Sequence, residues 1–362
     1  MAEPSPRSLD SLPLLVLMGI AEELCPHCTE EPESQPWQPP IDSSYSYHGS
    51  ALLSRMRALA NLAATCRGLN EIVNPVLYHQ PLCGPPARCI SVLRTLDRRP
   101  DLARRVKALR LDYYGDSRIK DEDDRAFILE LIARHAPPQS DADTEDRATR
   151  RQTEDERQTE DERVDGDFRM NLLLAMCPSV ATFSTGLDYF QNFDRLRPAS
   201  LPRLKQAFVA HHDTELGIHL ESLRELYLAA PHLETFVGYM VVKVGPDAFP
   251  LANLRQLRLE QSSISARCLR GLLRSCHQLE SLVYIAGAGL DSDEQFSIRR
   301  LTKLILRYVP RLKHLELDFR NEMMGEAARE GYTDAADHLD PDPAPGFASL
   351  SHLETWCRYR DP

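Results

Sequence analysis

The sequence predicts an α/β fold built as an irregular solenoid, with parallel strands on the concave side and helices on the convex side. Three segments follow the pattern L-x-x-L-x-L, at 254–259, 279–284 and 312–317, with tyrosine in the last position of the second. Apolar residues at helical spacing precede the last two, within 268–276 and 299–308. Because neither the apolar strand nor the apolar helix face can be buried within one unit, stacking of successive units must supply the core.

The strand pattern is that of a leucine-rich repeat, and weaker copies extend it along the chain. Val106–Leu111 fits well, and partial copies lie at 180–185, 204–209, 233–238 and 353–358. An ordinary α/β domain is the alternative, but no glycine-rich phosphate loop follows any of these strands. We therefore predict a repeat region over 88–359, with irregular spacing between its units.

Two segments within the predicted repeat region have the composition of loops. Residues 139–167 hold twelve acidic residues and five arginines, and they include the tandem copy RQTEDE-RQTEDE. This segment has too few apolar residues to offset the entropy of ordering, so it predicts a disordered, solvated insertion rather than a docking arm. Residues 321–346 end in DPDPAPG and predict a second loop.

Charge and hydropathy disfavour several classes of protein. The net charge of −11 argues against nucleic-acid binding. No apolar run approaches the roughly 20 residues that a membrane helix needs, and acidic flanks argue against a secretory signal at the N-terminus. Nine cysteines without a regular framework favour reduced thiols and an intracellular location, cytoplasmic or nuclear. Cys66, Cys177 and Cys276 are expected to be small core residues.

The N-terminal residues 8–82 predict a domain of three short helices. LPLLVLMGIAEEL, residues 12–24, has apolar side chains on nearly every side of a helix. A loop rich in proline and serine is predicted over 25–49, and LANLAATCRGLNEIVNPVLYHQP, residues 59–81, predicts two more helices. Three short helices cannot bury this much leucine among themselves, so a partner or the start of the repeats must cover it.

These two helical segments closely resemble an F-box as found in fungal proteins, from the leucine-proline start to the closing P-x-L-Y. With the repeats that follow, the chain resembles the F-box and leucine-rich-repeat family over nearly its full length. The resemblance implies a substrate-recognition subunit of a cullin-type (SCF) ubiquitin ligase, in which the F-box docks on the Skp adaptor and the repeats hold a target protein. The chain departs from the family at Leu15, where glutamate is common, and in the long loop 25–49.

Two sets of contact residues are expected, the first implied by the resemblance and the second by the alternation of side chains along the strands. Those facing the adaptor are Leu12, Pro13, Val16, Leu17, Ile20, Leu24, Leu59, Leu62 and Cys66. Candidate substrate contacts lie between the strand leucines, where side chains alternate outward. They are Arg110, Asp112, Gln256, Arg258, Glu260, Ser281, Val283, His314, Glu316 and Asp318. The same outward positions would equally fit solvated strand residues without a binding role.

No constellation of residues supports catalysis, and we expect neither an enzyme nor a cofactor. Cys25-Pro-His-Cys28 has the C-x-x-C spacing of a zinc or redox site, but with no second ligand pair in sequence it is expected to be a loop without metal. The triplet 211–213, His-His-Asp, is likewise expected in a solvated loop. Two alternatives stay open: an interaction scaffold without a ligase role, and an enzyme that uses the C-x-x-C segment.

Overall fold

The computed structural model describes residues 9, 12–29, 46–84, 86–111, 119, 121–135, 169–187, 193, 196–211, 217–243, 250–287, 298–318 and 354–358. The predicted acidic insertion 139–167 and the predicted loop 321–346 lie outside these residues. None of the helices in the described part of the chain has the length and hydropathy to cross a membrane.

Four helices form the N-terminal helical domain: α1 (Leu14–Leu24), α2 (Pro26–Thr29), α3 (Ser46–Thr65) and α4 (Arg67–Leu77). The prediction of a continuous loop over 25–49 was wrong at both ends, because α2 and the first turn of α3 fall within it. Proline at the first position of a helix explains α2, since its missing N–H has no partner to lose there. A small core holds the helices together, made of Ala21, Cys25, Met56, Leu59, Ala63, Val73 and Val76.

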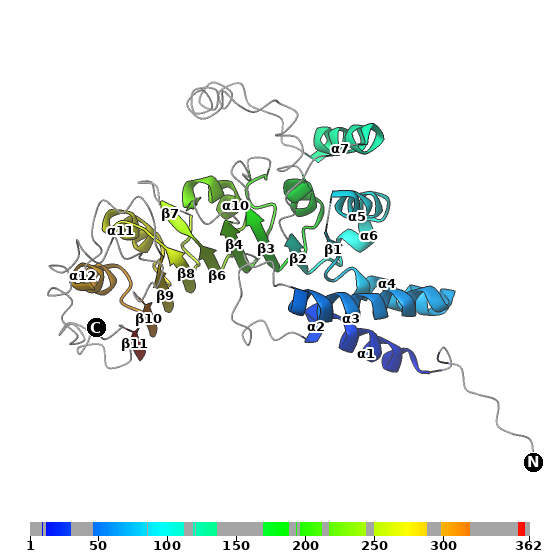
Figure 1. Ribbon diagram of the computed structural model, residues 1–362, viewed down its shortest axis with the longest axis horizontal. Coiled ribbons are helices and arrows are strands. Elements are labelled where there is room, and N and C mark those ends of the chain that lie inside the picture. The colour runs from blue at the N-terminus through cyan, green and yellow to red at the C-terminus, as the bar shows by residue number, and fades with distance from the viewer. Residues whose placement is uncertain are drawn as a thin grey trace, which may run out of the picture.

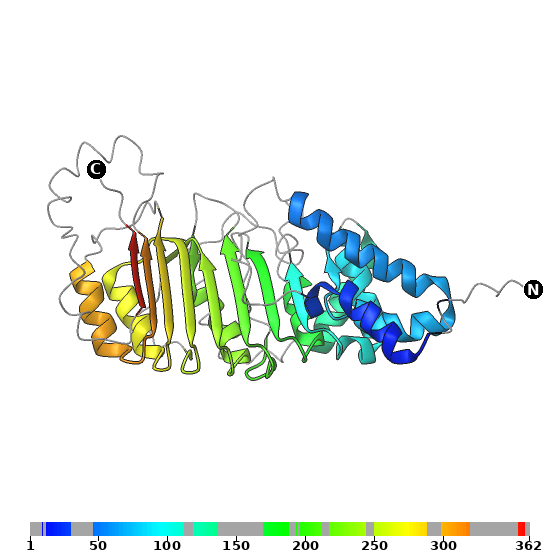
Figure 2. The same cartoon turned by 90° about the horizontal axis from the view of Figure 1, so that it is seen from below.

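A parallel sheet of nine strands follows, and its strands neighbour one another in chain order (Figures 1 and 2). They are β1 (Leu82–Cys83), β2 (Ala108–Leu111), β3 (Thr182–Leu187), β4 (Gln206–His211), β6 (Thr235–Tyr239), β8 (Gln256–Ser262), β9 (Ser281–Ala286), β10 (His314–Asp318) and β11 (Glu354–Arg358). Each predicted copy of the repeat pattern coincides with a strand of this sheet. The sequence did not predict β1, nor the separate pair β5 (Ile218–His219) and β7 (Val241–Lys243).

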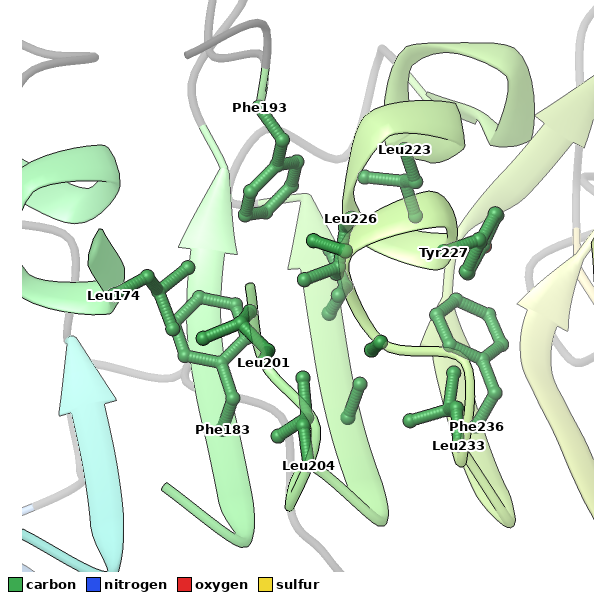
Figure 3. Close-up of a cluster of buried hydrophobic side chains, with 14 of the residues drawn as sticks. Leu174, Phe183, Phe193, Leu201, Leu204, Leu223, Leu226, Tyr227, Leu233 and Phe236 are labelled. Atoms are coloured by element: carbon green, nitrogen blue, oxygen red, sulfur yellow. The ribbon is translucent and has the colours of Figure 1, made fainter. Parts of the chain in front are cut away.

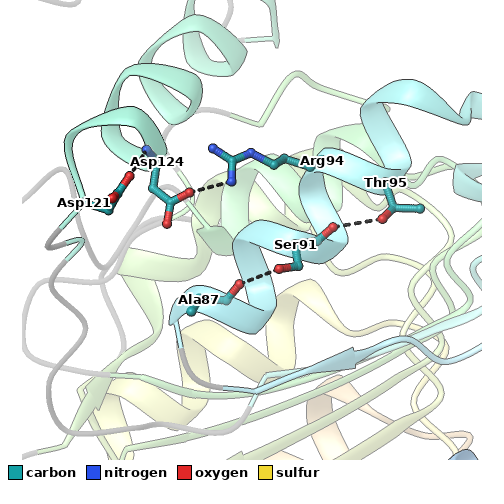
Figure 4. Close-up of polar contacts among 6 residues, drawn as sticks. All are labelled: Ala87, Ser91, Arg94, Thr95, Asp121 and Asp124. Carbon is teal, nitrogen blue, oxygen red and sulfur yellow. Dashed lines mark hydrogen bonds and ion pairs between the residues drawn. The ribbon is translucent and has the colours of Figure 1, made fainter.

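Helices line the outer side of the arc that the strands follow in Figure 1. They include α5 (Pro86–Arg98), α6 (Pro100–Ala103), α7 (Glu122–His135), α10 (Arg224–Ala229), α11 (Ala266–Ser275) and α12 (Ile298–Tyr308), with the short η2 (Leu220–Leu223) before α10. Residues 169–176 before β3 are helical as well. Arg94 of α5 forms an ion pair of 2.7 Å with Asp124 of α7, and Asp121 accepts the Asp124 N–H at 2.9 Å (Figure 4). This contact fixes the start of α7 against α5.

The second leucine of the repeat pattern forms one continuous buried row across the sheet. In register these residues are Leu109, Phe183, Ala207, Phe236, Leu257, Leu282 and Leu315. Each is at most 1% exposed. Ala207 stands between two phenylalanines in this row. The ring of Phe183 packs edge to face against Phe193, and that of Phe236 against Tyr227. Cys177 and Cys276 are buried as predicted, whereas Cys66 is exposed at the start of α4.

Charged residues of alternating sign stand directly before five consecutive strands, from β4 to β10. We call this row the charge ladder; it consists of Lys205, Glu234, Arg255, Glu280 and Lys313. Lys205 pairs with Glu234 at 3.0 Å, and Glu280 contacts both Arg255 at 2.9 Å and Lys313 at 2.6 Å. The hydrogen bond from Lys313 and the nearby positive charges hold the pKa of Glu280 below its usual value. The ladder therefore links neighbouring units at the edge where their strands begin.

The N-cap of α11 offers a direct test of how one unit is stabilised. Ser265 has an extended backbone, and its hydroxyl accepts the N–H of Cys268 at 3.2 Å. We expect Ser265→Ala to lower the free energy of unfolding by about 1 kcal/mol, because an N–H of the first turn loses its acceptor. Chemical denaturation measures this loss. Ser265→Asp keeps a capping oxygen and is the control, so equal losses in both variants would contradict the role of the cap.

Candidate functional site

An exposed apolar surface lies on α1 and the residues just before it. We call it the α1 apolar face; its members are Leu12, Leu14, Leu15, Val16 and Met18. Leu15 is 80% exposed, the largest value among the exposed hydrophobic residues of the described chain. The opposite side of α1, with Leu17 and Ala21, packs inward against α3 and α4. Contiguous exposed apolar surface of this kind marks a site of protein interaction.

The structure divides the predicted adaptor-facing residues into two groups. Leu12, Pro13, Val16 and Cys66 are exposed, and Ile20 is half-buried. Leu17 and Leu59 are buried within the chain, so the prediction that they face a partner was wrong. Leu24 and Leu62 pack against the helical core. A helix that is apolar on nearly every side gives no signal of which side turns inward, and here α3 and α4 cover the side of Leu17.

Four side chains with metal-ligating atoms gather where α1 ends. They are Cys25, His27 and Cys28 around α2, and His79 just after α4. The Nδ1 atom of His79 lies 3.9 Å from Cys25 Sγ and 3.4 Å from Cys28 Sγ, and His27 Nδ1 lies 3.7 Å from Cys28 Sγ. Cys25 is buried, the two histidines are half-buried, and Cys28 is exposed. The prediction of a loop without further ligands was therefore wrong, because folding brings His79 to the motif.

The protonation of this cluster follows from its surroundings. Burial, with smaller contributions from the charges of His27, Lys107 and Arg105, lowers the pKa of His79 to about 4. Partial burial, with the neighbouring Cys25 thiol, raises the pKa of Cys28 to about 12. At neutral pH the metal-free cluster therefore holds a neutral imidazole and a protonated thiol. A neutral imidazole is the form that coordinates a metal ion.

The open face of the sheet carries the predicted substrate contacts in two cross-strand rows. The first row is polar and runs Thr182, Gln206, Thr235, Gln256, Ser281 and His314. The second row runs Arg110, Ser184, Phe208, Val237, Arg258, Val283 and Glu316. The register therefore brings residues from separate predicted strands side by side, as a binding surface on this face requires.

The residues of this face differ in how far their side chains are exposed to a partner. Arg258 forms an ion pair with Glu260 along β8, and both are only partly exposed. Val283 is 6% exposed, so its prediction as a contact residue was wrong. It lies on a central strand, between Arg258 of β8 and Glu316 of β10. Asp318 ends β10, and Asp112 lies outside the described residues. His211 was predicted in a solvated loop, but it is buried at the end of β4.

Comparison with known proteins bears on the repeat region. Residues 217–315 match the family model described as FBD-associated F-box protein At5g56370, LRR repeats. No curated protein matches the chain. The match supports leucine-rich repeats over these residues, which carry β6, β8, β9 and the start of β10. It gives no support to the specifically fungal type that the sequence predicted, because the family is named for a plant protein.

Sequence reasoning missed several residues of these sites. Leu14, Leu15 and Met18 belong to the α1 apolar face but were not among the predicted contacts. His27 lies inside the C-x-x-C motif and was available as a third ligand in the sequence itself. His79 had no such signal, since it is separated from Cys28 by 51 positions in the chain.

Proposed function

We propose that this chain is the substrate-recognition subunit of a cullin-type (SCF) ubiquitin ligase, acting inside the cell. In this proposal the N-terminal helical domain is an F-box that docks on a Skp-type adaptor, and the repeats form a solenoid that binds the target protein. In this role the chain performs no catalysis itself. The α1 apolar face carries the proposal, because five exposed apolar residues at one end of a repeat protein require a partner to cover them.

The open face of the sheet is the proposed surface for the target protein. Its polar row offers hydroxyl, amide and imidazole groups, and the second row adds Arg258 and Glu316. These groups suit a protein surface of mixed charge, since polar groups at a protein interface need complementary partners. The match of residues 217–315 to the repeats of an F-box protein agrees with this division of labour.

Leu15→Asp is the direct test of adaptor docking. Burying one leucine side chain in an interface contributes about 1.5 to 3 kcal/mol. We expect the variant to bind the Skp adaptor of the same organism at least about tenfold more weakly, because the charge must also be desolvated. Co-purification and calorimetry with the intact chain measure the change. Leu15 is so exposed that the fold should be unaffected.

Leu129→Asp is the matched control, because Leu129 is also exposed but lies on α7, outside the helical domain. It should bind the adaptor as the unmodified chain does. If the intact chain binds no Skp adaptor from its own organism, the ligase role is wrong and a scaffold without that role becomes the better account. If both variants bind equally well, the α1 apolar face is not the docking surface.

A further inference from the structure

The cluster at the end of α1 brings together four side chains of one chemical character. We propose that Cys25, His27, Cys28 and His79 bind one Zn²⁺ ion in a closed tetrahedral site. The ligand atoms of all four residues lie within 4.8 Å of one another. Zinc bonds of about 2.3 Å to sulfur and 2.0–2.1 Å to nitrogen place tetrahedral ligand atoms about 3.3 to 3.8 Å apart.

The distances in the cluster already approach those values. Cys28 Sγ lies 3.4 Å from His79 Nδ1 and 3.7 Å from His27 Nδ1, and Cys25 Sγ lies 3.9 Å from His79 Nδ1. All other separations are at most 4.8 Å, so small shifts of the ligand atoms would complete the site. Ordinary contacts rarely bring four thiol and imidazole groups together. A structural zinc ion requires four protein ligands at once, and this cluster supplies four.

Backbone hydrogen bonds hold both ligand segments in place. The N–H of Cys28 donates to the carbonyl of Cys25 at 3.1 Å, which closes the turn between the two thiols. The N–H of His79 donates to the carbonyl of Val76 at 3.0 Å, which fixes the turn after α4. Because these hydrogen bonds hold the main chain of both segments, zinc binding needs little reorganisation and the site is preorganised.

The donor set selects the metal. Two thiolates and two imidazoles in a tetrahedron suit zinc, whereas magnesium and calcium take oxygen ligands. Four protein ligands leave no open position for water or substrate, so the ion would stabilise structure and perform no catalysis. A disulfide between Cys25 and Cys28 is the competing chemistry, but both thiols are free in the structure.

Zinc at this position would join the helical domain to the sheet. The carbonyl of His79 accepts the N–H groups of Lys107 at 2.8 Å and Ala108 at 2.9 Å, at the start of β2. His79 thus contacts the sheet with its backbone and the cluster with its ring. A metal ion held by His79 and by Cys25 would fasten the end of α1 to the first full strand of the repeats.

The test measures zinc in the full-length chain, purified without chelators and reconstituted with Zn²⁺. Mass spectrometry of the metal should give about one zinc per chain, falling to about a tenth or less in Cys28→Ser and His79→Gln. Cys28 is exposed, so its replacement by serine removes a ligand without opening a cavity. Cobalt exchanged into the unmodified chain should show the absorption of a tetrahedral site with thiolate ligands, a readout that does not depend on any variant.

Two controls separate this site from adventitious binding. Cys268→Ser and His277→Gln change the same residue types in and after α11, far along the chain from the cluster, and both should keep the zinc. The proposal is overturned if the unmodified chain takes up no zinc. It also fails if Cys28→Ser and His79→Gln retain as much zinc as the controls, or if cobalt gives an octahedral spectrum. Circular dichroism confirms that each variant remains folded.

Discussion

Leu17→Asp is expected to unfold the helical domain and, with it, to abolish adaptor binding. Leu17 is 4% exposed and lies on the inward side of α1. An unpaired carboxylate at a buried apolar position costs several kcal/mol, a large part of the 5–15 kcal/mol that stabilises a typical domain. Circular dichroism should report the loss of helix, and limited proteolysis should cleave residues 12–77 first.

The repeat region should stay folded in this variant, because its core residues form a cluster separate from that of the helical domain. Leu14→Asp is the matched control, with the same change in charge on the exposed side of the same helix. It should keep the helical content and still weaken adaptor binding. A Leu17→Asp chain that melts like the unmodified protein would show that α1 does not need this contact.

Phe236→Ala is expected to cause the largest loss of stability in the repeat region. Phe236 is 1% exposed, and its ring meets that of Tyr227 edge to face, with centroids 5.6 Å apart (Figure 3). Replacing a buried phenylalanine by alanine costs about 3–5 kcal/mol, through lost burial and the cavity that remains. Urea denaturation should show the transition at a lower midpoint with an unchanged slope.

Phe208→Ala tests whether burial is the cause. Phe208 lies on the neighbouring strand β4 but on the open face, where it is only partly buried. Its loss should cost clearly less stability than that of Phe236. Target binding is the property that Phe208→Ala should change instead, since the side chain belongs to the second row of the open face. Equal losses of stability in the two variants would contradict the assignment of the two faces.

Much of the sheet could be predicted because the spacing of leucines in the repeat pattern indicates both a strand and the side of it that is buried. The L-x-x-L-x-L segments place two leucines on the covered face, and even the partial copy at 204–209 became β4. The strands that the sequence missed, β1, β5 and β7, are two or three residues long. Such short segments cannot display an alternating pattern, and their pairing depends on neighbours placed by the rest of the fold.

The sites were harder to predict than the fold, for two physical reasons. The leucines of 12–24 surround α1, so sequence periodicity could not tell that Leu15 is exposed and Leu17 buried. The cluster around Cys25 depends on a contact between residues more than 50 positions apart. Helical periodicity and motif spacing describe neighbours along the chain, whereas this contact arises from the packing of α1 against α4.

The charge ladder gives the repeats an order. Lys205, Glu234, Arg255, Glu280 and Lys313 alternate in sign, so each unit fits beside a neighbour of opposite charge. Removing the unit that carries Glu280 would set Arg255 beside Lys313, and like charges at that distance repel. Removing that unit together with an adjacent one would restore the alternation. The units are thus alike in their leucines but not interchangeable, and insertions or deletions within the ladder keep its alternation only when they come in pairs.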